Sequence, residues 1–216
     1  MSTKPLLLDG CSKAGGAATG YKRAGFDVLC VDIETQPNNP FWFHQADIRE
    51  FIAKHGKEFD AIHVSPPCQN YTTAAQQWRK SGKQYPDLIA DIRALLVEAG
   101  RPYVIENVKN APLLNPTMLT SAHFGVMVAR DRYYETSFRM PFELMRQHSK
   151  KPVKMGRAVS EGDVVYPVGH FSGAEYVRRQ MGFYWMTQDE LREAIPWQHT
   201  EYIGRYLLAE IMQEAA

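Results

Sequence analysis

A cysteine that follows two prolines is the feature of this sequence that points most directly to chemistry. Cys68 lies in "VSPPCQNYT", residues 64–72, directly after Pro66 and Pro67. A cysteine attacks carbon as its thiolate, a form favoured where a cationic or dipolar neighbourhood lowers the thiol pKa. The prolines fix the backbone of the loop, and the polar residues after the cysteine do not suit a core position. We therefore favour a nucleophile over a small buried hydrophobe.

An acid follows a second apolar run. In "YVIENVKN", residues 103–110, Glu106 comes directly after Val104 and Ile105. Desolvation at the end of a buried strand raises the pKa of a carboxyl group, which can then hold or deliver a proton. Taken alone, an ordinary strand-end carboxylate is the simpler interpretation. The functional interpretation requires that the fold bring Glu106 and Cys68 to the same edge of a sheet.

Two arginines are spaced for one face of a strand. In "VARDRYYETS", residues 128–137, strand alternation places Arg130 and Arg132 on the same side. Two guanidinium groups there can hold a phosphate, or tune a nearby acid and thiolate. The alternative is a pair of exposed strand arginines that bind Asp131 or Glu135.

A Gly-rich turn and two acids suggest a bound small molecule. In "LLLDGCSKAGGAATG", residues 6–20, small residues between a strand and a helix let a ligand approach the backbone. The next strand ends in "VDIE", and an acid at this point commonly accepts a hydrogen bond from a ribose, which makes Asp32 a candidate. "ADI", residues 46–48, adds a polar and apolar pair suited to an adenine edge. Each aspartate is otherwise a surface carboxylate or a helix cap.

These residues can act together only if a common sheet positions them. Strand-like and helix-like stretches alternate over the first two thirds of the chain, which is typical of βαβ units on a mostly parallel sheet. The expected strands are 5–9, 26–33, 59–64 and 101–108, and the expected helices are 15–25 and 87–100, the second with Gly100 as its C-cap.

The alternation fails beyond Arg139, where a Lys-rich segment punctuated by Gly and Pro runs to about Gly173. We expect an insertion or small lobe there. Thr187 and Glu190 then match a capping box, and a final helix is expected through "YLLAEIMQEA", residues 206–215.

Composition bounds the class of protein. The chain has 216 residues, 44% of them hydrophobic, which favours one domain with a small appendage. No segment has the roughly 18 apolar residues of a membrane span, and no signal peptide is evident, so we expect a soluble, cytoplasmic protein. The 3 cysteines are widely spaced, which argues against disulfides and against a metal site.

The net charge of +1 gives little overall attraction to nucleic acid, so a polyanion site must come from local clustering. Such a cluster of basic residues occurs within residues 139–157, where Glu143 is the one acidic residue. The basic residues are Arg139, Arg146, Lys150, Lys151, Lys154 and Arg157. A solvated basic loop is an equally good interpretation of this segment by itself.

Taken in order, "DGCSKAGGAATG", "VDIE", "ADI", "SPPCQNYT", "IENV" and "RDR" resemble the successive motifs of the DNA (cytosine-5) methyltransferase family. The resemblance covers Pro5 to about Ser137 and resumes more loosely from about Met181. It implies an α/β, Rossmann-like fold that uses S-adenosylmethionine, with a mostly parallel twisted sheet, helices on both faces and a small basic insertion lobe. The implied division is a core at 1–138, a short target-recognition lobe at 139–180, and C-terminal helices at 181–216 that complete the core.

The resemblance also implies roles for individual residues. Cys68 would be the nucleophile, Glu106 would engage the cytosine edge, and Arg130 and Arg132 would lie near the active site. The implied contacts of S-adenosylmethionine are Asp9, Cys11, Gly15, Asp32, Ile33, Asp47, Ile48 and Pro67. No metal is implied.

The implied mechanism is attack of the Cys68 thiolate on carbon 6 of cytosine, which activates carbon 5 for methylation. The base must be flipped out of the duplex, and the loop "TTAAQQWRKSGKQYPD", residues 72–87, can close over it or remain a surface loop. The expected contacts with double-stranded DNA are Gln69, Trp78, Arg79, Lys80, Lys150, Lys151 and Lys154.

Three departures from the family pattern are evident. Lys13 stands where the family usually has Gly, and Arg205 follows Gly204 where the family has Asn. Only about Arg139 to Arg179 is available for target recognition, which predicts a short or relaxed sequence preference. We expect a monomer from a bacterial or phage setting, such as a restriction-modification system.

Two alternatives stay open from the sequence. One is methylation of another cytosine substrate, such as a free nucleotide, a modified cytosine or RNA. The other is a catalytically idle module that binds nucleic acid. A cysteine hydrolase is disfavoured because neither His63 nor His123 is a plausible partner for Cys68.

Overall fold

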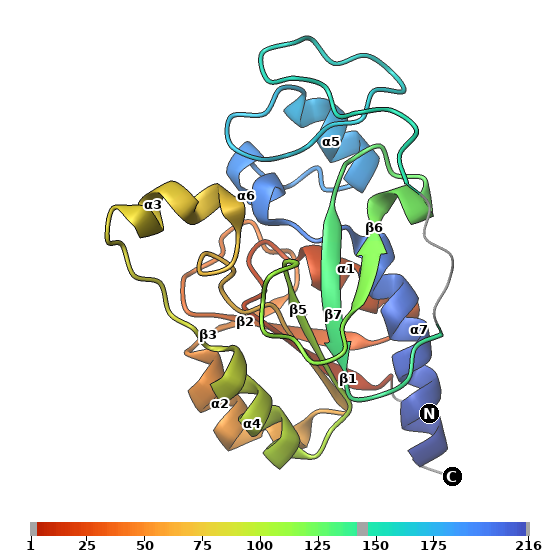
Figure 1. The fold of residues 1–216 in the computed structure, drawn as a ribbon. Helices are drawn as coiled ribbons and strands as arrows, with labels where there is room; N and C mark the ends of the chain where they lie inside the picture. The colour runs from red at the N-terminus through yellow and green to blue at the C-terminus, as the bar shows by residue number, and fades with distance from the viewer. Residues whose placement is uncertain (1–3, 142–146, 215–216) are drawn as a thin grey trace.

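The computed structural model describes residues 4–141 and 147–214. Arg146 and Glu143 of the predicted basic segment lie outside these ranges. Within them, the chain folds around one mixed sheet of seven strands with helices on both faces, as Figure 1 shows. The predicted α/β class, with a mostly parallel sheet covered on both sides, is therefore confirmed.

The sheet has the strand order β3-β2-β1-β4-β5-β7-β6. The first five strands along the chain run parallel, whereas β7 lies between β5 and β6 and is antiparallel to both. The strands of the sheet are β1 (Leu6–Gly10), β2 (Asp27–Asp32), β3 (Trp42–Gln45), β4 (Ala61–Val64), β5 (Tyr103–Asn107), β6 (Thr117–Thr120) and β7 (Asp131–Thr136). Parallel neighbours place the carboxyl ends of β1, β2, β4 and β5 at one edge.

One face of the sheet is covered by α1 (Gly16–Ala24) and by the longer α7 (Trp197–Glu214). The other face is covered by α2 (Ile48–His55) and α4 (Ile89–Ala99). Leu7 and Leu8 show why β1 reads as a continuous apolar run. Both are fully buried, but Leu7 packs under α1 and α7, whereas Leu8 packs under α2 and α4.

Close contact between α1 and α7 depends on Gly20. A Cβ atom at this position would lie 2.1 Å from Thr200 Oγ1 and 2.2 Å from the Trp197 carbonyl oxygen. The Thr200 hydroxyl uses this proximity, because it donates a hydrogen bond of 2.9 Å to the Ala17 carbonyl. The C-terminal helix is thereby fixed against the helix that follows the Gly-rich turn.

A third apolar cluster lies above the sheet edge, in the part of Figure 1 that holds α5 (Ala174–Met181) and α6 (Gln188–Glu193). It joins residues of the predicted lobe, such as Val165, to Val126 and Val128, which precede β7. A single parallel bridge links Val128 to Val165. The cluster therefore spans the predicted boundaries at 138 and 180, and the three-part division stays a prediction.

Short helices complete the described structure: α3 (Gln76–Lys80), and the 3₁₀ turns η1 (Gly56–Glu58), η2 (Thr73–Ala75) and η3 (Ser121–Phe124). The segment expected as a closing loop thus contains α3, and the final helix begins at Trp197 rather than Tyr206. The capping box at α6 is confirmed, since Thr187 and Glu190 exchange hydrogen bonds. Over the described ranges, none of the helices combines the length and the apolar character needed to cross a membrane.

Candidate active site

A cavity of about 260 Å³ opens at the carboxyl edge of the sheet. This is slightly below the roughly 300–1,000 Å³ typical of small-molecule sites. Many of the residues that the sequence singled out line it: Asp9, Cys11, Asp32, Ile33, Asp47, Ile48, Pro67, Cys68, Gln69, Glu106 and Arg132. The predicted nucleophile, the predicted acid and the predicted cofactor contacts thus share one space.

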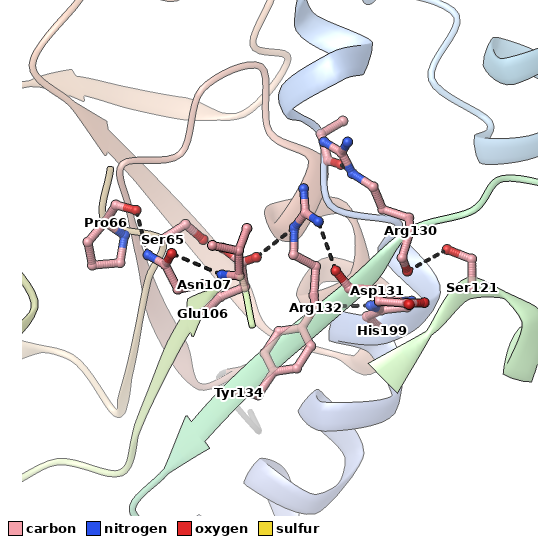
Figure 2. Close-up of polar contacts among 12 residues, drawn as sticks. Ser65, Pro66, Glu106, Asn107, Ser121, Arg130, Asp131, Arg132, Tyr134 and His199 are labelled. Carbon is pink, nitrogen blue, oxygen red and sulfur yellow. Dashed lines mark hydrogen bonds and ion pairs between the residues drawn. The ribbon is translucent and has the colours of Figure 1, made fainter. Parts of the chain in front are cut away.

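The loop after β4 is held in place from β5. Asn107 donates a hydrogen bond of 2.9 Å from Nδ2 to the Pro66 carbonyl, and its Oδ1 accepts from the Val108 amide at 2.9 Å (Figure 2). The Cys68 carbonyl accepts from the amides of Tyr71 and Thr72, each at 2.9 Å. Sequence analysis did not identify Asn107, although its place beside Glu106 in "IENV" was a usable signal. These contacts fix the backbone that carries the thiol.

The charge environment of Cys68 differs from the expectation. Burial raises the pKa of the thiol, and the Glu106 carboxylate raises it further, whereas Arg132 and Arg130 lower it. The expectation of a lowered pKa is therefore wrong for this structure, because desolvation outweighs the two guanidinium groups. The resting side chain is a thiol, and it must lose its proton before it can attack carbon.

Glu106 and Arg132 form a buried ion pair. Arg132 Nε lies 2.9 Å from Glu106 Oε1, with 16% and 7% of the two side chains exposed (Figure 2). Burial raises the pKa of Glu106, while Arg132, Arg130 and a hydrogen bond from Ser65 lower it. The net shift is upward, which confirms the expected direction. A carboxyl group in this setting can hold a proton and still be stabilised after the proton leaves.

Arg130 does not line the cavity within the described part of the chain. Its guanidinium group donates to the carbonyl oxygens of Ala194, at 3.1 Å, of Pro167, at 3.5 Å, and of Arg192. Burial lowers its pKa to about 9. Arg130 directly precedes β7, so the placement of both arginines on one strand face stays a prediction. Arg130 ties the start of β7 to the lobe and to the C-terminal end of α6.

The turn between β1 and α1 holds two non-glycine residues in the left-handed region. Cys11 has a φ of 56° and Lys13 a φ of 46°. Such conformations are costly for residues with a Cβ atom and are concentrated at functional sites. The strain is offset at Lys13, whose amide donates to Asp32 Oδ2 at 3.0 Å. Lys13 Nζ also approaches Glu34, at 3.3 Å, and Glu193, at 3.9 Å.

Gly15 has a φ of 80° and forms the N-cap of α1. A Cβ atom there would lie 2.8 Å from the Phe41 ring and 3.1 Å from Asn39 Oδ1. Gly15 does not line the cavity, so the structure supports a role in shaping the turn. Asp47 combines two of the roles considered for it, because it lines the cavity and caps α2 through the Arg49 amide.

Asp9 and Ser12 are buried acceptors aimed at the cavity wall. Neither Asp9 oxygen, nor Ser12 Oγ, has a hydrogen-bond partner among the described residues. Burial, together with Asp32 and Glu106, raises the pKa of Asp9 to about 8, although the nearby amide of Ala18 opposes the shift. Unpaired buried polar groups are costly, so a ligand with donors or positive charge fits this end of the cavity.

S-adenosylmethionine has the matching chemistry. Its ribose hydroxyls and amino group are donors, and its sulfonium is positive, whereas the cavity presents the acids Asp9, Asp32 and Asp47. Ile33 and Ile48 supply apolar surface for an adenine ring. The residues present therefore fit this cofactor.

The far wall of the cavity comes from the C-terminal part of the chain, which sequence analysis did not connect with the site. It contains Met186, Glu190, Glu193, Ala194 and Ile195. Glu190 is positioned twice, because both of its oxygens accept from Asn38 Nδ2, at 3.0 and 3.1 Å, and one accepts from the Thr187 amide. The capping box was the only signal that could have placed this residue.

The predicted nucleic-acid contacts occupy three places. Gln69 lines the cavity. Trp78, Arg79 and Lys80 lie on α3, where the Arg79 guanidinium donates to the carbonyls of Gln69 and Thr72 and so binds its own loop. The third place is the lobe, whose exposed predicted contacts are Lys150, Lys151 and Lys154. Lys150 Nζ donates to the Gly162 carbonyl at 3.1 Å.

No protein-family model matches the chain, and no curated protein matches it. Solved structures do. S. pombe Dnmt2 methyltransferase superposes with a TM-score of 0.65 at 15% identity, over 97% of this chain and 99% of the other. The Entamoeba histolytica methyltransferase EhMeth gives a TM-score of 0.63 at 13% identity, over 97% and 99%. A mutant of Spodoptera frugiperda DNMT2 gives 0.59 at 14% identity, over 96% and 99%. At these identities the likeness establishes the fold, so the predicted Rossmann-like methyltransferase fold is confirmed.

Proposed function

We propose that this chain belongs to the DNA (cytosine-5) methyltransferase family and transfers a methyl group from S-adenosylmethionine to carbon 5 of cytosine in DNA. One observation carries the proposal. Cys68, Glu106 and Arg132 line the same cavity as Asp9, Asp32 and Asp47, so a nucleophile and an acid adjoin a site that fits the cofactor. The shared fold with structures described as Dnmt2 methyltransferases supports it.

Cys68 and Glu106 divide the activation of the base between them. Solvent water takes the thiol proton of Cys68, and the thiolate then forms a bond to carbon 6. The electron pair of the 5,6 double bond becomes a 4,5 double bond, and the pair of the 3,4 double bond moves to ring nitrogen 3, which takes the proton of Glu106. Carbon 5 becomes nucleophilic. Arg132 Nε, 2.9 Å from Glu106, stabilises the carboxylate that remains.

When bound, S-adenosylmethionine supplies the methyl group as an electrophile and leaves as a neutral thioether. Asp9, Asp32 and Asp47 would hold its donor groups. After methylation, a water molecule removes the proton from carbon 5, and the carbon–sulfur bond breaks with its electron pair returning to Cys68. Nitrogen 3 then returns its proton to Glu106, and the Cys68 thiolate regains a proton from solvent, so both residues are restored.

Duplex DNA is the favoured substrate because the lobe offers cations without acidic partners. Among the described residues, Lys150, Lys151 and Lys154 form no ion pair, whereas Arg157 and Arg179 pair with Asp163 and Glu161. Free surface cations suit a phosphate backbone. Cytosine in duplex DNA would have to be flipped to reach a cavity at the sheet edge.

The deciding experiment uses tritium-labelled S-adenosylmethionine with duplex DNA of mixed sequence, RNA, and free deoxycytidine nucleotides in parallel. We expect label in 5-methylcytosine of DNA, lost in Cys68→Ser. Cys30→Ala is the matched control, because Cys30 is buried in β2 among core residues and does not line the cavity.

Duplex DNA that carries 5-fluorocytosine tests the covalent step separately. Fluorine cannot leave carbon 5 as a proton does, so the Cys68 adduct should persist and appear as a mass increase on the peptide that contains Cys68. If label appeared only in RNA or only in free nucleotide, that molecule and not DNA would be the substrate. Binding of DNA with no label in any substrate would leave the catalytically idle module.

A further inference from the structure

A chain of hydrogen bonds runs beneath the carboxyl group of Glu106. Tyr21 of α1 and Ser65, at the end of β4, contact opposite nitrogens of the His63 ring. The Tyr21 hydroxyl lies 2.9 Å from Nδ1, and the Ser65 hydroxyl lies 2.9 Å from Nε2. Ser65 and Glu106 both line the cavity, and the Ser65 hydroxyl lowers the pKa of the Glu106 carboxyl group. Tyr21 and His63 are fully buried, so no bulk water competes along the chain.

The direction of this chain follows from its far end. Within residues 4–141 and 147–214, the Tyr21 hydroxyl has His63 Nδ1 as its only hydrogen-bond partner. A buried hydroxyl that fails to donate loses a hydrogen bond, so Tyr21 donates to Nδ1. His63 is neutral, since burial lowers its pKa to about 3, and its proton therefore resides on Nε2.

The tautomer of His63 decides what Ser65 can do. With its proton on Nε2, His63 donates to Ser65 Oγ, and the Ser65 hydroxyl hydrogen is left to point at Glu106. A hydroxyl that donates to a carboxyl group favours its ionised form. Glu106 is thus supported from two sides, by Arg132 on Oε1 and by Ser65 from below.

We infer that His63 is a positioning residue that acts through Ser65, holding the Ser65 hydroxyl as a donor so that Glu106 can release its proton to ring nitrogen 3. The inference rests on the role of Glu106 in the proposed function. His63 does not itself line the cavity in the described structure, although Ser65 does. Its effect is to stabilise the carboxylate that remains after proton transfer.

Other titratable groups also face Glu106 and share control of its pKa. They come from β1, α1, the loop after β4, β7 and the residue before it: Asp9, Tyr21, Cys68, Arg130, Arg132 and Tyr134. A test of His63 must therefore separate its route through Ser65 from the effects of these groups.

The test measures the pKa of Glu106 without substrate. Infrared difference spectra over a pH titration report the carboxyl stretch, and Glu106→Gln identifies the band. We expect Ser65→Ala and His63→Phe each to raise this pKa, and the double variant to raise it no further than Ser65→Ala alone. His63→Gln, whose amide nitrogen can donate in place of Nε2, should restore it.

His55→Phe is the control, because His55 of α2 contacts Glu58 at 2.9 Å and has no printed contact with Ser65 or Glu106 in the described part of the chain. Its pKa effect on Glu106 should be absent. If His63→Phe unfolds, the comparison of Ser65→Ala with Ser65→Ala plus His63→Gln still tests the route. An unchanged Glu106 pKa in His63→Phe, or additive shifts in the double variant, would overturn the inference.

The kinetic arm separates this inference from the proposed function. On cytosine DNA, His63→Phe should lower turnover about 10- to 100-fold, the loss of one hydrogen bond to a charged group. Methylation by the wild type with an unchanged pKa in His63→Phe would reject only the role of His63. Absence of methylation by the wild type, with the pKa shifts present, would reject only the proposed reaction.

Discussion

Arg132 Nε lies 2.9 Å from Glu106 Oε1, and this contact joins β7 to β5, its antiparallel neighbour in the sheet. Because both side chains are largely buried, neither charge is easily replaced by solvent. Burial and the arginine act in opposite directions on the pKa of Glu106, and burial prevails. The carboxyl group therefore holds its proton more readily than a free glutamate does, and Arg132 stabilises the ionised form.

Replacement of Arg132 should disturb both halves of that balance. In Arg132→Met, the pKa of Glu106 should rise further, and turnover on cytosine DNA should fall at least about 100-fold, because the carboxylate left after proton transfer has lost its partner. Infrared titration and single-turnover kinetics measure the two effects. Arg205→Met removes an exposed arginine paired with Glu201, and unchanged values are expected there. Equal losses in both variants would refute the assignment.

The thiol of Cys68 should become more acidic when Glu106 loses its charge. The Glu106 carboxylate raises the pKa of Cys68, so Glu106→Gln should lower it. The measurement is the pH dependence of alkylation by iodoacetamide, followed by mass spectrometry of the peptide that contains Cys68. Alkylation of Cys11 in the same sample is the internal control. A Cys68 profile that moves to higher pH would contradict the charge arrangement.

Asp9 should make stability depend on pH. Its folded-state pKa of about 8 exceeds the ordinary 3.8, so between these values the folded chain holds a proton that the unfolded chain has lost. Stability should fall as pH rises through this window, by at most about 1.4 kcal/mol per pH unit, and level off above about pH 8. Asp9→Asn cannot ionise, so its advantage over the wild type should grow over the same range in urea unfolding. Parallel curves for the two proteins would reject the buried, unpaired acid.

At Lys13, a glycine variant should be more stable than an alanine variant, which is the reverse of the usual order within a helix. At a φ of 46°, glycine avoids the cost of a Cβ atom, so Lys13→Gly should be more stable than Lys13→Ala by about 1 kcal/mol. At Lys54, exposed within α2, alanine should be the more stable by a similar amount. Urea unfolding of the four variants gives both differences. The same order at both positions would show that the turn is not strained.

Apolar runs and turn residues predicted the elements that carry the chemistry. The strands around 5–9, 26–33, 59–64 and 101–108, and the helix closed by Gly100, all form. The edge strand β3 escaped prediction because little of it is buried; Trp42, for example, is 65% exposed. The helix α2 also escaped, because a helix cap was considered for Asp47 only as the alternative to a ligand contact, and Asp47 is the N-cap of α2.

Sequence spacing placed the site residues but not their partners. Alternation treated Arg130 and Arg132 as a pair, but Arg130 precedes β7 and donates to carbonyl oxygens at the C-terminal end of α6, whereas Arg132 pairs with Glu106. The direction of the pKa shift of Cys68 could not be predicted from its cationic neighbours alone, because burial decides that direction. Tyr21 and His63 are 42 positions apart, and only the fold brings them together.

One residue separates the two arginines, and this spacing has a mechanical consequence. Arg130 donates hydrogen bonds to the carbonyl oxygens of Pro167, Arg192 and Ala194, while Arg132 forms an ion pair with Glu106. Asp131 is the one residue that connects these two sets of contacts. A displacement of the lobe at Pro167 would therefore be passed to Arg132 across one intervening residue. The lobe and the carboxyl group at the cavity are thus coupled through neighbouring residues of the backbone.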